Sequence, residues 1–186
     1  MKVIPTELPG VLIIEPSVFG DDRGFFLEIY QRRRFAEAGI TTEFVQDNLS
    51  LSMRGVLRGL HYQHPTGQAK LIQVLAGEVF DVVLDVRSGS PTIGLWQTTI
   101  LTGDNKRQLF VPPGFAHGFC VMRDHTLFHY KVSDYYAPLH EVSVRWNDPD
   151  LAIPWPIPEP TLSDKDRLGL RLRHIAAARL PPYDRP

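Results

Sequence analysis

Short segments with continuous or alternating hydrophobic residues recur along the whole chain. Such segments are typical of β-strands when turn residues separate them. Turn residues do separate many of them, as at residues 20–22, 88–91, 103–105 and 112–114. The pattern predicts strands over residues 11–14, 25–30, 56–62, 71–75, 79–86, 93–101, 108–111, 118–122, 127–132 and 142–146. Many short strands at this spacing predict an all-β fold, either a sandwich or a barrel.

Two segments have helical character instead. Residues 31–38 contain good helix formers and precede Gly39, a residue type common just after a helix. A second helix is predicted over residues 163–180, with Ser163 as its N-cap and Asp166 at the capping-box position. Residues 147–160 are rich in proline and tryptophan, which predicts an extended strap. No repeat or boundary is visible, so we expect one domain over residues 1–186.

The composition narrows the class of partner. The 186 residues carry a formal net charge of -1, so overall charge attracts neither nucleic acid nor a membrane surface. An anionic ligand would need a few placed cations. The single cysteine, Cys120, lies in an apolar run and is expected to be buried and unreactive. No signal peptide or membrane-spanning run is visible, so we expect a cytoplasmic protein.

His61 is the first candidate for chemistry. Alternation along a strand would place residues 57, 59, 61 and 63 on one face and Arg58 on the other. Gly59 lies between Arg58 and His61, where a β-bulge would redirect a side chain. Taken alone, the segment favours a half-buried core histidine.

His117 ends a Pro-x-Gly-x-x-His sequence that resembles the second signature motif of the cupin superfamily. Many cupins use that histidine as a metal ligand, with a His-x-His pair and a glutamate from a first motif. Here the nearest pair, His61 and His64, is spaced one residue too far for one face of a strand. The metal site therefore looks incomplete, and the other histidines have no ligand partners by spacing: His125, His129, His140 and His174.

Three further polar residues have ordinary structural explanations when each is taken alone. Tyr130 follows apolar residues on a predicted strand and would usually be a packed aromatic with a bonded hydroxyl. Asp166 would be a solvated acid in the first turn of a helix. Arg23 would be a turn residue in a surface ion pair.

A series of motifs follows one another from the first residues to about Asp166. They comprise residues 19–28, 45–48, 55–63, 68–71, 77–82, 85–87, 90–92, 105–109, 113–119, 130–131, 146–149, 155–156 and 162–166. Together they resemble the dTDP-4-dehydrorhamnose 3,5-epimerase family, whereas residues 167–186 carry no motif of that family.

This resemblance implies a cupin-type β-barrel (jelly roll) with a few short helices, one of them near the C-terminus. It also implies a homodimer that needs no cofactor and no metal, and the apolar segment 11–14 could pair across a sheet edge in such a dimer. The implied substrate is dTDP-4-dehydro-6-deoxy-D-glucose and the product is dTDP-4-dehydro-6-deoxy-L-mannose. The pathway would supply dTDP-L-rhamnose for cell-surface polysaccharide.

The resemblance also implies roles for individual residues. His61 is similar to the family's base, Tyr130 to its acid, and Asp166 to the partner that orients the base. Lys70 is similar to the residue near the C4 carbonyl oxygen. The implied substrate contacts are Arg23, Phe26, Glu28, Gln46, Asn48, Arg58, His117, Glu141 and Lys165.

These residue types suit the implied chemistry. A 4-keto group acidifies the hydrogens on C3 and C5, and the resulting enolate needs a cation such as Lys70. Histidine suits proton abstraction near neutral pH, and a carboxylate such as Asp166 fixes its tautomer. Inversion needs a proton from the opposite face, which a phenol such as Tyr130 can deliver. Arg23 and Arg58 have forked donors that match a diphosphate.

Three other functions stay open from the sequence. A 3-only or 5-only epimerase of another deoxysugar would use the same His61 and Tyr130. A metal-dependent cupin dioxygenase or isomerase would bring His61, His64 and His117 to one ion. A non-catalytic cupin that binds a sugar nucleotide would not need a base, an acid and an orienting carboxylate together.

Overall fold

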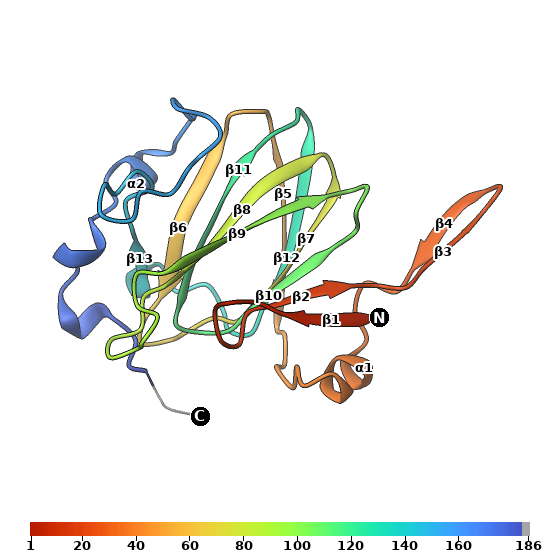
Figure 1. Ribbon diagram of the computed structural model, residues 1–186, viewed down its shortest axis with the longest axis horizontal. Coiled ribbons are helices and arrows are strands. Elements are labelled where there is room, and N and C mark those ends of the chain that lie inside the picture. The colour runs from red at the N-terminus through yellow and green to blue at the C-terminus, as the bar shows by residue number, and fades with distance from the viewer. Residues whose placement is uncertain (184–186) are drawn as a thin grey trace.

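A computed structural model describes residues 1–183 and confirms the predicted all-β, cupin-type fold. Two antiparallel sheets face each other and form a barrel (Figure 1). In order across the first sheet lie β1 (Lys2–Pro5), β2 (Leu12–Glu15), β10 (Gln108–Val111), β7 (Lys70–Ala76), β12 (Thr126–Val132) and β5 (Gln46–Ser52). Across the second lie β13 (Glu141–Ser143), β6 (Leu57–Gln63), β11 (Phe115–Val121), β8 (Glu78–Asp85) and β9 (Trp96–Thr102).

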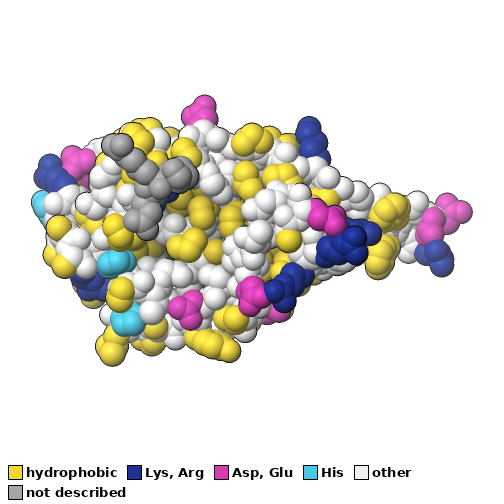
Figure 2. Space-filling model, turned by 90° about the horizontal axis from the view of Figure 1, so that it is seen from below, with side chains coloured by type: hydrophobic (Ala, Val, Ile, Leu, Met, Phe, Trp, Pro, Cys, Tyr) yellow, Lys and Arg dark blue, Asp and Glu magenta, His cyan; other side chains and the backbone are white. Residues whose placement is uncertain are grey.

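A hairpin of β3 (Val18–Asp21) and β4 (Gly24–Leu27) projects from the barrel, and we call it the arm (Figure 1). Its aromatic side chains face solvent, with exposed fractions of 65% for Phe19, 61% for Phe25 and 69% for Phe26. Seen from below, the arm is a narrow extension that carries hydrophobic side chains and, at its tip, charged ones (Figure 2). Clustered exposed aromatic residues are typical of a contact surface.

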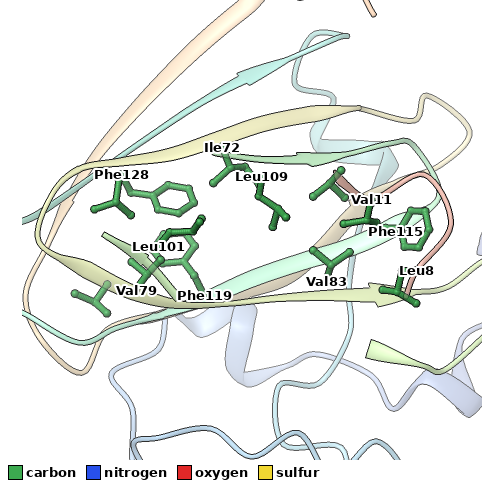
Figure 3. Packing of buried hydrophobic residues seen from close by; sticks show 13 residues of the cluster. Leu8, Val11, Ile72, Val79, Val83, Leu101, Leu109, Phe115, Phe119 and Phe128 are labelled. Atoms are coloured by element: carbon green, nitrogen blue, oxygen red, sulfur yellow. The ribbon is translucent and has the colours of Figure 1, made fainter. Parts of the chain in front are cut away.

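A hydrophobic core fills the space between the two sheets (Figure 3). Strand alternation supplies it, because every second side chain of β7 and β8 points into the barrel, including Ile72 and Val79. Phe119 on β11 and Phe128 on β12 come from opposite sheets, and their rings stack with centroids 3.8 Å apart. Burying one such side chain stabilises the fold by about 1.5–3 kcal/mol. The core therefore holds the two walls of the barrel at a fixed separation.

The first predicted helix is confirmed, whereas the second is much shorter than predicted. Helix α1 (Arg32–Glu37) begins after Gln31, whose side chain accepts a hydrogen bond from the backbone of Arg34. Helix α2 covers only Asp164–Arg167, followed by two short 3-10 helices, Leu172–His174 and Ala177–Arg179. The reason is the approach of the chain to β13. The backbone of Leu170 bonds to Ser143, and a Cβ atom at Gly169 would lie 2.9 Å from the backbone nitrogen of Arg145.

Several strand boundaries also differ from the prediction. Three strands were not predicted at all: β1, β3 and β5. Residues 93–95, predicted as strand, form a turn, and residues 28–30 lie outside β4. The predicted edge at residues 11–14 is wrong, because β2 lies between β1 and β10, and β1 forms that edge of the sheet.

Three other predictions about the chain can be compared with the structure. Cys120 is fully buried on β11, as predicted. Residues 147–160 form the predicted strap without a regular helix or strand. Within residues 1–183, no helix is both long enough and apolar enough to cross a membrane.

Candidate active site

A cavity of about 730 Å³ lies between the two sheets of the barrel. Strands of both sheets and helix α2 contribute its polar lining. Every residue predicted to be catalytic lines this cavity, namely His61, Lys70, Tyr130 and Asp166. So do these predicted substrate contacts: Gln46, Asn48, Arg58, His117, Glu141 and Lys165.

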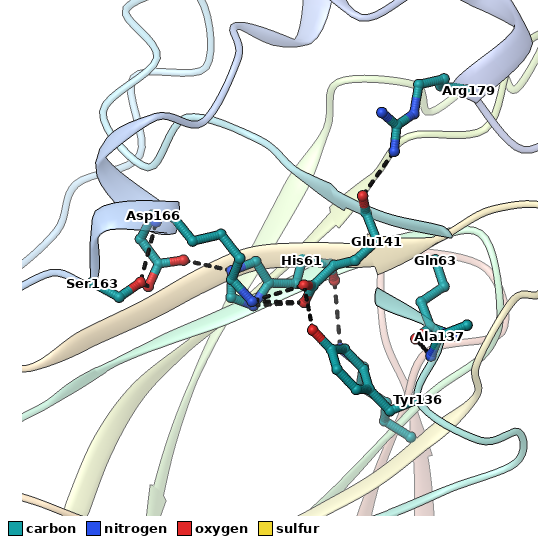
Figure 4. A network of polar contacts seen from close by, with 10 residues as sticks. His61, Gln63, Tyr136, Ala137, Glu141, Ser163, Asp166 and Arg179 are labelled. Carbon is teal, nitrogen blue, oxygen red and sulfur yellow. Dashed lines mark hydrogen bonds and ion pairs between the residues drawn. The ribbon is translucent and has the colours of Figure 1, made fainter. Parts of the chain in front are cut away.

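His61 and Asp166 form a close pair at the wall of the cavity (Figure 4). The Nε2 atom of His61 lies 2.5 Å from Oδ1 of Asp166. The second carboxylate oxygen of Asp166 accepts a hydrogen bond from Ser163 at 2.7 Å, so the carboxylate is held from both sides. Burial alone would raise the pKa of Asp166, but the hydrogen bonds from His61 and Ser163 outweigh it and lower that pKa. The negative charge of Asp166 therefore persists beside the imidazole.

The other ring nitrogen of His61 faces Glu141. Its Nδ1 atom lies 3.8 Å from a Glu141 oxygen, beyond hydrogen-bond distance. The Glu141 carboxylate itself accepts hydrogen bonds from Lys165 at 2.8 Å and from the Tyr136 hydroxyl at 3.0 Å (Figure 4). Burial would raise the pKa of Glu141, and the bond from Lys165 and the charge of His61 lower it overall. Nδ1 is thus the nitrogen of His61 that is left for a ligand.

A β-bulge brings Arg58 and His61 to the same cavity. The pairing of β6 with β11 changes register between His61 and Arg58, so simple alternation fails there. Gly59 has φ of +115°, and a Cβ atom on it would lie 2.6 Å from the Cα atom of Gly118. Only glycine fits that position without moving the neighbouring strand. The bulge inferred at Gly59 is confirmed, and it redirects the Arg58 side chain into the site.

Lys70 begins β7, and its ammonium group donates a hydrogen bond of 3.4 Å to the carbonyl oxygen of His61. Burial lowers the pKa of Lys70 to about 8, although the nearby carboxylates of Glu141 and Asp81 act in the opposite direction. Tyr130 lies on the neighbouring strand β12, in register with Ile72 of β7. Burial raises the pKa of the Tyr130 phenol, which keeps it protonated as a potential proton donor.

His117 lies in the floor of the cavity and is 6% exposed. Its Nε2 atom lies 2.8 Å from Oδ2 of Asp81 on the adjacent strand β8. The ring of Phe128 stacks against the imidazole, with centroids 6.1 Å apart. Burial lowers the pKa of His117, and Asp81 opposes that effect. His117 is therefore a buried histidine held by a buried carboxylate.

Three predicted substrate contacts lie away from this cavity within one chain. Arg23 is on the arm, where its side chain is 90% exposed and pairs with Asp21. Phe26 is also on the arm, and Glu28 follows it and pairs with Arg34 at 3.0 Å. The structure of a single chain thus separates these residues from the others.

Comparison with known proteins gives this site its context. A family model described as dTDP-4-dehydrorhamnose 3,5-epimerase matches residues 5–174. The chain belongs to this family. A dTDP-4-dehydrorhamnose 3,5-epimerase of Shigella flexneri is 54% identical over 171 residues, covering 91% of this chain and 94% of the relative. A relative of the same name from Pseudomonas aeruginosa is equally similar, with 54% identity and the same coverage.

Solved structures of the family agree with this assignment. A Legionella pneumophila dTDP-6-deoxy-D-glucose-3,5-epimerase, solved in complex with dTDP-4-keto-L-rhamnose, is 52% identical. It superimposes with a TM-score of 0.96, covering 99% of each chain. The chain is therefore an isomerase with the cupin-type barrel of this epimerase family. The family also has members with other names, such as a dTDP-4-dehydrorhamnose 3-epimerase of Streptomyces niveus, 43% identical over 184 residues.

A metal-dependent cupin, one of the alternatives left open by the sequence, would bring His61, His64 and His117 together around one metal ion. Within residues 1–183, no group of three or more His, Cys, Asp and Glu side chains is arranged to hold a metal ion. His61 and His117 both line the cavity, and each bonds to its own carboxylate, Asp166 and Asp81 respectively.

Sequence reasoning missed several residues in or next to the cavity. Asp81, which bonds to the cavity residue His117, was visible as one of two acids in the mostly apolar segment 79–86, which is a signal for a buried polar contact. Ser163 had been identified only as a helix cap. Gln68 and Phe119 belong to the motifs 68–71 and 113–119 but were given no role, whereas Phe128, on an apolar strand, and Tyr136, in a loop, gave no recognisable signal.

Proposed function

We propose that the protein inverts both C3 and C5 of dTDP-4-dehydro-6-deoxy-D-glucose to give dTDP-4-dehydro-6-deoxy-L-mannose, in dTDP-L-rhamnose biosynthesis. The observation that carries this proposal is the placement of His61 and Tyr130 on opposite sheets of the barrel, both lining one cavity. A sugar ring between the sheets would meet a base on one face and a proton donor on the other. Opposed groups are what inversion requires, because the proton must return to the face opposite the one it left.

The base in this proposal is Nδ1 of His61. Asp166 occupies Nε2, so it orients the ring and stabilises the imidazolium that forms when Nδ1 takes a proton from carbon. Asp166 stays ionised because its pKa is lowered. Ser163 in turn fixes the carboxylate.

Lys70 stabilises the enolate. Loss of a proton from C3 or C5 moves negative charge to the C4 oxygen, and a positioned ammonium group stabilises that charge in a site with little water. Tyr130 then protonates the enolate carbon from the other wall. Its raised pKa keeps the proton on the phenol until an enolate is present to receive it.

The nucleotide end of the substrate needs cations outside the reacting region. Arg58 lines the cavity, and its forked guanidinium suits a diphosphate. Lys165 also lines the cavity and donates a hydrogen bond to Glu141. We propose that the protein is a homodimer in which the arm of one subunit brings Arg23, Phe26 and Glu28 to the cavity of its partner. The exposed aromatic side chains of the arm support this arrangement.

The test is incubation with the 4-keto sugar nucleotide in deuterated water, followed by proton NMR. A double epimerase incorporates deuterium at both C3 and C5 and gives the L-manno product. Exchange and inversion at C3 alone would identify the 3-only alternative, for which the Streptomyces niveus relative is the precedent by name. If neither C3 nor C5 exchanged its hydrogen, the proposal would be refuted.

A further inference from the structure

Asp81 is a buried acid whose hydrogen bonding is incomplete. It is fully buried on β8, and its Oδ2 atom bonds to His117. Its Oδ1 atom is buried and has no hydrogen-bond partner among residues 1–183. A buried carboxylate is costly unless paired, by several kcal/mol. A carboxylate kept in such a place requires a functional or structural reason.

Asp85, four residues further along β8, provides the contrast. It is also fully buried, but both of its oxygens are bonded, to the guanidinium of Arg87 and to the hydroxyls of Ser90 and Thr92. These bonds fasten the turn after β8 and are purely structural. Asp81 has no such turn to fasten, and its one partner, His117, lines the active-site cavity.

Asp81 also acts electrostatically on Lys70, because its negative charge raises the pKa of the Lys70 ammonium group. Asp81 and Glu141 both favour the protonated form of Lys70, whereas burial and Lys165 oppose it. Asp81 belongs to one sheet and Lys70 to the other. Besides Lys70 and Glu141, the titratable groups that line the cavity are His61, His117, Tyr130, Tyr136, Asp47, Asp166, Arg58 and Lys165. Glu141 is already engaged by Lys165 and Tyr136, so Asp81 is the carboxylate with a free oxygen.

We propose that Asp81 is a positioning residue for epimerisation, which holds His117 in the tautomer with its proton on Nε2 and keeps Lys70 positively charged. This inference rests on the proposed function, in which the Lys70 ammonium stabilises the enolate. The Nε2 proton of His117 is donated to Oδ2 of Asp81, so Nδ1 of His117 remains an acceptor. The free oxygen of Asp81 leaves negative charge available to Lys70.

The first test compares Asp81→Asn with Asp85→Asn, two isosteric changes on one strand. Asp81→Asn should lower kcat about tenfold or more and change KM less than about twofold, because an effect on the enolate appears in the transition state. The alkaline limb of its pH profile should move to lower pH by about one unit, because Lys70 loses a favourable charge. Asp85→Asn should lower the melting temperature and leave that limb in place.

A kcat loss in Asp81→Asn without movement of the alkaline limb would overturn the proposal, since a merely structural defect has that signature. A wild-type profile for Asp81→Asn would also overturn it. If the wild-type enzyme epimerises its substrate but Asp81→Asn does not behave as expected, the proposed epimerase function stands and only the proposed role of Asp81 is refuted.

A second measurement needs no variant and no substrate. In wild-type protein labelled with 15N-histidine, long-range 1H–15N correlation spectra report the tautomer of each imidazole. The proposal requires His117 to carry its proton on Nε2 with a bare Nδ1 at neutral pH. A His117 protonated on Nδ1 with a bare Nε2 would mean that Asp81 donates the bond, and it would overturn the proposal even if Asp81→Asn fails to fold.

Discussion

The Nε2 atom of His61 lies 2.5 Å from Oδ1 of Asp166, although 105 positions separate them in the sequence. This pair gives the first prediction. His61→Ala should abolish both deuterium exchange and epimerisation, because no proton leaves carbon without the base. Asp166→Asn should lower kcat less severely, by about 100-fold or more, because it misplaces the base without removing it. Single-turnover kinetics in deuterated water would measure both, and His61→Ala exchanging at the wild-type rate would exclude His61 as the base.

Tyr130→Phe should separate exchange from inversion. The phenyl ring keeps the packing against Phe128, whose ring centroid lies 5.9 Å away, but the transferable proton is lost. His61 can still remove a proton and return one from solvent to the same face. Proton NMR in deuterated buffer should therefore show exchange at C3 or C5 with little inverted product. Equal loss of both would assign Tyr130 to binding or enolate formation instead.

Activity should fall as pH rises through about 8. The pKa of Lys70 is lowered to about 8 by burial, so its ammonium group loses its proton there and no longer stabilises the enolate. The pKa values of Asp166 and Glu141 are lowered, so both carboxylates stay charged well into the acidic range. A profile of kcat against pH tests this, and a Lys70→Arg variant should not show the same alkaline limb. A rate that stays constant up to pH 10 would contradict the assignment of Lys70.

Lys70→Met should stabilise the fold while it removes activity. The ordinary pKa of 10.5 falls to about 8 in the folded state, so folding disfavours the charged form. Below pH 8 that cost is fully present, and it disappears as pH rises from 8 to 10.5. The difference of 10.5 − 8 = 2.5 units corresponds to at most about 3 kcal/mol. Urea unfolding at pH 7 should show a higher midpoint for Lys70→Met and a smaller gain at pH 10. Lys131→Met is the control, because Lys131 forms an ion pair with Asp47.

Mixed dimers should show whether the arm, with Arg23, contributes to the cavity of its own subunit or to that of the partner. Arg23→Ala and His61→Ala should each inactivate their own homodimer. If the arm serves the partner's cavity, a mixed dimer has one cavity with both wild-type residues. Statistical reassociation of equal amounts should then restore about a quarter of the wild-type active sites. No recovery after verified subunit exchange would mean that Arg23 acts in its own chain.

The sequence predicted the barrel better than it predicted the boundaries of its elements. Strands such as β8 and β12 are rich in Val, Leu and Phe, so periodicity identifies them. Strand β5 has the sequence Gln-Asp-Asn-Leu-Ser-Leu-Ser, in which polar residues hide the strand, and its pairing with β12 holds it in the sheet. The prediction of a long C-terminal helix was wrong because the bond of Leu170 to Ser143 of β13 and the packing of Gly169 against Arg145 outweigh local helix propensity.

In the site, too, local sequence patterns failed where the geometry depends on contacts between distant segments. Alternation alone put Arg58 on the wrong face, and the bulge at Gly59 depends on the close approach of Gly118 from another strand. Family motifs brought His61 and Asp166 together in the interpretation where spacing alone had not. The partner of His117, Asp81, was missed, because an acid in a mostly apolar strand does not reveal which neighbour it will meet.

The arm contributes no residue to the hydrophobic clusters within residues 1–183. Substitutions on it therefore carry little risk of unfolding the barrel, whereas almost any change around Phe119 or Phe128 does. The hairpin can in this way accept changes on the surface that projects from the barrel, while the packing between the sheets stays the same. New substrate specificities could therefore arise from substitutions in this one hairpin. They would not require the core of the barrel to repack, which usually limits how far an enzyme can change.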